Sequence, residues 1–132
     1  MSTWTHVVGA IRFDGIPRTS IETFQFEAIN AIMRGELKVD DKGVLRPLIS
    51  RRKLPTGSEG PIQYTLHQYG NGLPWIVIPI WGDLRDYDNV TEIKDWFFDL
   101  CQRYPLVRDA VLRIQVEDRE PIVIQYDLEK SV

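Results

Sequence analysis

Residues 3–13 read TWTHVVGAIRF, and this stretch decides the fold. From position 7 onward its odd-numbered positions carry apolar or small residues, namely Val7, Gly9, Ile11 and Phe13. Successive side chains of a β-strand point to opposite faces of a sheet, so this alternation predicts a strand that turns those four residues toward a core. The even-numbered residues then face away from the core: Trp4, His6, Val8, Ala10 and Arg12. Asp14-Gly15 indicates the turn that ends the strand.

Further elements follow from the same kinds of pattern. Thr19 and Glu22 form a capping box that predicts the start of a helix, and apolar residues then recur at helical spacing as far as Gly35. A second helix is expected from about Val90 to Arg103. Strands are expected at residues 62–69, 75–81, 110–117 and 122–128, the first two joined by Gly70-Asn71-Gly72.

The order of these elements, β-α-β-β-α-β-β, predicts the fold class. The expected fold is α+β, with a ferredoxin-like split βαβ antiparallel sheet, two helices on one face and an additional C-terminal strand. The spatial order of the strands is then 2-3-1-4, with the fifth strand beside the fourth. Residues 1–132 are expected to form a single domain. A long, partly mobile basic excursion at about residues 36–61 interrupts the pattern, and Asp40-Asp41-Lys42-Gly43 within it predicts a small hairpin.

Composition narrows the class of protein. The formal net charge of −3 provides no global positive field that would attract a nucleic acid polymer or an anionic membrane. Cys101 is the only cysteine, which excludes a disulfide within one chain and favours a reducing compartment, the cytoplasm. The N-terminus lacks the pattern of a signal peptide, and no apolar run is long enough to span a bilayer.

Two helices cover only one face of such a sheet, so the second face must meet solvent, a ligand or another subunit. Aromatic residues and arginine are enriched at protein interfaces, and the sequence predicts an interface there formed by Trp4, His6, His67, Trp75 and Arg113. A two-residue turn at Asp118-Arg119 would add Ile122, Ile124 and Tyr126 to this face, whereas a longer turn would reverse their direction. Pro79 is disfavoured in a central strand, and a bulge there would re-aim Trp81.

The cationic part of the excursion is the candidate for anion binding. Guanidinium groups and glycine-rich backbone suit phosphate, and neighbouring aromatic rings suit a nucleotide base. The predicted ligand-binding residues are Arg51, Arg52, Lys53, Thr56, Gly57, Ser58, Glu59, Gly60, Tyr64 and Trp81. The alternative interpretation is a solvated basic loop.

The remaining reactive residues indicate no cofactor and no metal. His6 and His67 are expected on strands separated by a third strand, and two histidines are too few for a zinc site. Asp83, Asp86 and Asp88 are interpreted as the acidic entry to the second helix, with Arg85 as their ion-pair partner. Cys101 is interpreted as a small buried hydrophobic residue.

Residues 4–14, 57–61 and 82–87 resemble segments of small, mostly uncharacterised proteins of tailed bacteriophages. The resemblance implies a phage protein in the host bacterial cytoplasm, where small non-enzymatic oligomers assist assembly or sequester host immune signals such as cyclic nucleotides. It transfers no catalytic residue.

Three functional hypotheses follow. The first is a non-catalytic homo-oligomer that sequesters a small phosphorylated ligand such as a cyclic nucleotide and so helps a phage to evade host defence. The second is a phage assembly or adaptor protein that acts through protein–protein contacts. The third is a small hydrolase that uses His6 or His67 as a general base.

Overall fold

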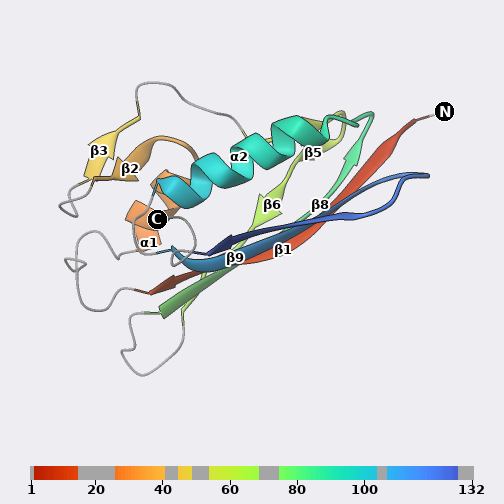
Figure 1. Ribbon diagram of the computed structural model, residues 1–132. Coiled ribbons are helices and arrows are strands. Elements are labelled where there is room, and N and C mark those ends of the chain that lie inside the picture. The colour runs from red at the N-terminus through yellow and green to blue at the C-terminus, as the bar shows by residue number, and fades with distance from the viewer. Residues whose placement is uncertain are drawn as a thin grey trace.

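The large sheet of this protein has β1 (Trp4–Asp14) in its middle. The computed structural model describes residues 2–14, 26–40, 45–48, 54–68, 75–103 and 107–127. Within them the sheet runs β10 (Ile122–Asp127), β9 (Val107–Val116), β1, β8 (Trp75–Arg85) and β6 (Gln63–Tyr64), and β7 (His67–Gln68) also pairs with β8. Every pair in it is antiparallel. The predicted strand order is therefore confirmed (Figure 1).

The predicted fold class is wrong. The described residues are mostly β, and the only helices among them are α1 (Phe26–Met33) and α2 (Val90–Gln102), which are both short. The chain is therefore built around one large antiparallel sheet and is not a ferredoxin-like α+β domain. The prediction underestimated strand because it gave the excursion one small hairpin, whereas the excursion forms two small two-stranded sheets of its own.

One small sheet pairs β2 (Leu37–Val39) with β3 (Leu45–Pro47), which confirms the predicted hairpin; residues 41–44 lie outside the described part of the chain. The other pairs β4 (Thr56–Gly57) with β5 (Gly60–Pro61). This second hairpin packs on the end of β8, where the Ser58 N–H donates to the Arg85 carbonyl at 2.9 Å. Where it is described, the excursion thus forms two short hairpins, while residues 41–44 and 49–53 lie outside the described residues.

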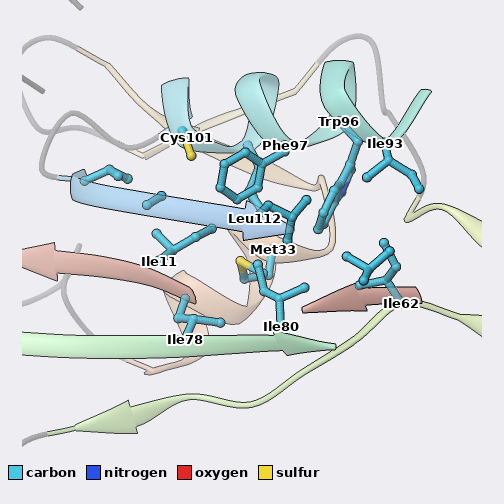
Figure 2. Packing of buried hydrophobic residues seen from close by; sticks show 14 of the residues in the cluster. Ile11, Met33, Ile62, Ile78, Ile80, Ile93, Trp96, Phe97, Cys101 and Leu112 are labelled. Atoms are coloured by element: carbon cyan, nitrogen blue, oxygen red, sulfur yellow. The ribbon is translucent and has the colours of Figure 1, made fainter. Parts of the chain in front are cut away.

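The hydrophobic core lies between the sheet and the two helices (Figure 2). Predicted inward residues of all three long strands are fully buried in this core, namely Ile11, Ile78 and Leu112. They meet Trp96 and Phe97 of α2, as the close-up shows. Helix α2 forms where it was expected: Asn89 caps it by accepting from the Glu92 N–H, and its apolar stripe falls at 3.6-residue spacing.

Gly9 marks a close approach between β1 and β9. A Cβ atom at this position would lie 2.1 Å from the Val111 carbonyl oxygen and 2.8 Å from the Leu112 side chain. Only glycine leaves room for that contact. The Gly9 position therefore sets how tightly the two central strands pack.

Pro79 lies inside β8 without a bulge. The β1–β8 register runs unbroken from Trp4 opposite Arg85 to Asp14 opposite Trp75. The proline faces β6 and β7 instead, where its carbonyl accepts from the Thr65 N–H at 3.3 Å. Since a proline cannot return that hydrogen bond, the ladder is interrupted between β6 and β7 while the register stays the same on both sides.

The direction of the last strand is the one expected for the longer of the two alternative turns. Ile122, Ile124 and Tyr126 pair with the inward residues Ile114, Leu112 and Ala110, so they lie on the core face. Residues 117–121 separate β9 from β10, and this connection is longer than the two-residue turn of the first prediction. A shift by one residue moves every side chain of a strand to the other face.

Candidate functional site

The candidate site is the face of the large sheet opposite α1 and α2, called here the uncovered face. Its side chains come from alternate positions of the strands; they are Trp4, His6, Val8, Ala10, Arg12, Gln63, His67, Val77, Pro79, Trp81, Asp83, Arg85, Asp109, Val111, Arg113, Gln115, Val123 and Gln125. Among the described residues no helix lies on this side (Figure 1).

Apolar side chains are exposed mainly on this face. Five large hydrophobic residues of the described chain are exposed, and four of them lie here: Val8 at 53%, Trp81 at 45%, Val111 at 39% and Val123 at 58%. The fifth, Phe98, is on α2. Exposed apolar residues that are grouped on one surface usually mark an interaction site.

One row of residues crosses the uncovered face from edge to edge. The pairing registers place Val123 beside Arg113, Arg113 beside Val8, Val8 beside Trp81, and Trp81 beside Gln63. The row therefore has an aliphatic centre, a cation on one side and an aromatic ring on the other. Arg113 donates to the Gln115 side chain at 2.8 Å, and no described carboxylate lies within ion-pair distance of it.

Charged groups flank this row in pairs. His6 Nδ1 lies 2.6 Å from Asp83 Oδ1, and the two residues are direct cross-strand partners. Arg12 Nε lies 3.5 Å from Asp109 Oδ1. Because all four side chains are about half exposed or more, these pairs contribute little to stability and leave the face with both signs of charge.

A shallow hollow of about 360 Å³ opens beside the Arg12–Asp109 pair. Its lining residues come from β1, β9 and β10: Ala10, Arg12, Asp109, Ala110, Val111, Gln125 and Tyr126. The small side chain of Ala10 between larger neighbours accounts for the depression.

Four of the five predicted interface residues lie on this face. His6, His67 and Arg113 are exposed and Trp4 is half-buried. Backbone pairing places Trp75 opposite Asp14 at the end of β8, and its side chain lies outside the described part of the structure. His6 and His67 are on strands separated by β8, as expected.

The predicted phosphate cradle is engaged in contacts within the chain. The Ser58 hydroxyl donates to Asp86 Oδ2 at 2.8 Å, and Glu59 accepts from Arg85 Nη1 at 3.4 Å. Gly57 packs against the Arg85 backbone so closely that a Cβ atom would lie 2.7 Å from the nitrogen. Thr56 donates to the Leu54 carbonyl, and Gly60 closes the hairpin opposite Gly57. Arg51, Arg52 and Lys53 lie outside the described residues.

Tyr64 and Trp81 are not on the same side of the sheet. Tyr64 pairs with the buried Ile80 and packs on the core, whereas Trp81 pairs with Gln63 on the uncovered face. Burial raises the pKa of the Tyr64 hydroxyl, while Arg34 lowers this pKa to a smaller extent and Glu36 raises it slightly. The structure therefore does not bring the two aromatic rings together around one base.

The acidic cluster is also dispersed. Asp83 belongs to β8 and pairs with His6, and Asp86 bonds Ser58. Arg85 pairs with Glu59 and donates to the Ser2 hydroxyl, so the expected ion pairs with its aspartate neighbours do not form. No group of three His, Cys, Asp or Glu among the described residues could hold a metal ion. Cys101 is fully buried, as expected, and desolvation raises its pKa to about 12.

Sequence reasoning missed Asp83, Val111 and Val123 as members of the uncovered face. The signal for Asp83 is present, because the alternation of β8 continues through inward Gly82 and Leu84. The face on which Val123 lies depends on the length of the turn between β9 and β10, and the sequence pattern did not determine that length.

Comparison of the chain with protein-family models, curated proteins and solved structures gave no match. Among the described residues, no helix is long and apolar enough to cross a membrane.

Proposed function

We propose that this protein is an interaction module that self-associates through the uncovered face of its sheet. The observation that carries the proposal is the concentration of exposed apolar side chains there, with Val8, Trp81, Val111 and Val123 against Phe98 alone elsewhere in the described chain. Homo-oligomers with two-fold symmetry bury the same patch on both copies, so such a patch must complement itself. An apolar centre flanked by both signs of charge meets that requirement.

The size of the face supports the same proposal. Five strands about 4.8 Å apart span about 19 Å, and a ten-residue strand such as β9 extends about 33 Å. The outline is thus on the order of 600 Å², which is at the lower end of the area that a stable protein interface buries on each partner. Two such sheets would pack about 10 Å apart, with the helices outside.

We place this module among assembly or adaptor proteins, in which the face is used for protein contacts. The resemblance to phage proteins makes the cytoplasm of a bacterial host the proposed setting. The single buried Cys101 is suited to a reducing compartment. Capture of a phosphorylated ligand stays a prediction that depends on Arg51, Arg52 and Lys53, and it has less support because Tyr64 and Trp81 lie on opposite faces.

Sedimentation velocity over a dilution series tests the proposal. The wild-type protein should shift from dimer toward monomer on dilution, and Val8→Glu should be monomeric at every concentration because it places a charge in the apolar centre. Phe98→Glu is the matched control, since it adds the same charge to an exposed apolar position on α2, and it should behave as the wild type. A wild-type protein that is monomeric throughout would refute the proposal.

A further inference from the structure

We infer that two copies pack face to face about a two-fold axis that runs along β1, so that Trp81 of each copy covers Arg113 of the other. This inference rests on the proposed self-association and specifies its geometry. It follows from the order of the strands and from the row of residues that crosses the uncovered face.

The strand order places β1 at the centre of the sheet. Two strands lie on one side of it, β9 and β10, and β8 and β6 lie on the other. A rotation of 180° about an axis along β1, in the plane between the two sheets, exchanges these sides. It therefore stacks β8 of one copy over β9 of the other, and β6 over β10.

The same rotation gives complementary contacts along the row. Val8 meets Val8 of the second copy on the axis, Trp81 meets Arg113, and Gln63 meets Val123, each contact occurring twice except the first. The apolar centre of each copy is thus covered by the apolar centre of the other copy. No cation in the row faces another cation.

Arg113 is suited to an aromatic partner. Its described partner is the neutral Gln115 side chain, and no described carboxylate neutralises it. A guanidinium over an indole ring is favourable, more so when the contact excludes water. Trp81 is 45% exposed and two strands away within its own sheet, so the ring is free to cover the arginine of a second copy.

A two-fold axis across the strands gives a worse arrangement. If it passed through the same row, each strand would stack on its own copy, and Arg113 would face Arg113 while Trp81 faced Trp81. Like charges brought together at a desolvated contact are unfavourable. An axis along β1 also brings Arg12 near Arg12 of the second copy, but each of these has its own Asp109 partner at 3.5 Å, whereas Arg113 has no described carboxylate partner. The row therefore favours the axis along β1.

Cross-linking of single-cysteine variants tests the contact at the centre of the face. Val8→Cys should give a covalent dimer with a short bis-maleimide, because the two cysteines meet on a two-fold axis that passes through Val8. Val111→Cys, on the same face but one strand away from the axis, should remain largely monomeric, and Phe98→Cys should too. The native Cys101 is buried and does not compete in the folded protein.

A second pair of variants tests the direction of the axis with substitutions that lie away from the axis. A mixture of Gln63→Cys and Val123→Cys should cross-link to each other more than either does to itself. Within one copy these positions lie on opposite edges of the sheet, so the product must join two copies. Cross-linking of Gln63→Cys or Val123→Cys to itself in preference to the mixed product, equal cross-linking of Val8→Cys and Val111→Cys, or no cross-linking in either experiment while wild type sediments as a dimer, would overturn the axis and leave self-association standing. A monomeric wild type would overturn both.

Discussion

The Ser58 hydroxyl donates a 2.8 Å hydrogen bond to the Asp86 carboxylate and so fastens the β4–β5 hairpin to the end of β8. Asp86 sits there with a positive φ of 56°, a conformation that aspartate tolerates better than most residues. The Ser58 hydroxyl, which sequence reasoning assigned to phosphate, is therefore already hydrogen-bonded to a carboxylate of the same chain.

Ser58→Ala should raise the pKa of Asp86. The hydrogen bond from Ser58 is the largest effect that lowers this pKa, followed by one from Ser2. A lowered pKa in the folded state stabilises the fold above the unfolded pKa of the carboxyl, and the contribution is lost as the pH falls through the folded pKa. NMR titration of Asp86 checks the prediction, and an unchanged pKa in the variant would contradict it.

Gly9→Ala should destabilise the protein strongly. The added Cβ would lie 2.1 Å from the Val111 carbonyl oxygen, so the two central strands must move apart. Forcing extra volume into a packed site costs about 1–3 kcal/mol or more. Gly82→Ala is the control, because its Cβ would be 3.4 Å from the nearest atom, on Ile62, an ordinary contact. Urea denaturation measures both, and equal losses would contradict the account.

Arg103→Ala should lower the free energy of unfolding by about 1.5–3 kcal/mol. The buried guanidinium donates to Asp99 on its own helix and to the Ile32 carbonyl, which joins α2 to the end of α1. Its loss removes these charge-assisted hydrogen bonds, and the Ile32 carbonyl keeps only the one from the Gly35 N–H at 3.1 Å. Arg34→Ala removes an exposed pair with Glu36 and should change stability by about 0.5 kcal/mol or less. A thermal or chemical unfolding series compares the two, and similar effects would argue against the buried contact.

The Cys101 thiol should not react in the folded protein. Burial raises its pKa to about 12, whereas an exposed thiol ionises near pH 8.5. Since the raised pKa favours the protonated form, its contribution to stability is complete below the unfolded pKa and is lost as the pH rises toward the folded pKa. Ellman's reagent at pH 8 should label the native protein only at the rate of unfolding, and immediate labelling would contradict burial.

The alternation of inward and outward side chains along the strands explains how much of the fold was predictable. Ile11, Ile78 and Leu112 were assigned inward from sequence alone, and the strand order followed from the sequence of elements. The direction of Ile124 was not predictable, because it depends on whether two or more residues turn between β9 and β10. The proportion of strand was missed for a similar reason, since Thr56–Gly57 and Gly60–Pro61 are too short to show a period.

The candidate site was predictable where it lies on regular strands. Trp4, His6, His67 and Arg113 were placed on the correct face by parity. In the predicted ligand site, Ser58, Glu59 and Tyr64 are held by tertiary partners far away in sequence, namely Asp86, Arg85 and the core. No local pattern indicates such contacts. Arg51, Arg52 and Lys53 lie outside the described residues, so the ligand site stays a prediction.

Hydroxyl-radical footprinting of the wild-type protein at rising concentration tests the central claim most directly, because it needs no substitution. Trp81 and Phe98 are exposed aromatic residues on opposite sides of the molecule, at 45% and 38%. If the uncovered face binds a second copy, oxidation of Trp81 slows as concentration rises while that of Phe98 stays constant. If both rates stay constant through the range in which the protein would associate, or if Phe98 alone becomes protected, the uncovered face is not the interface.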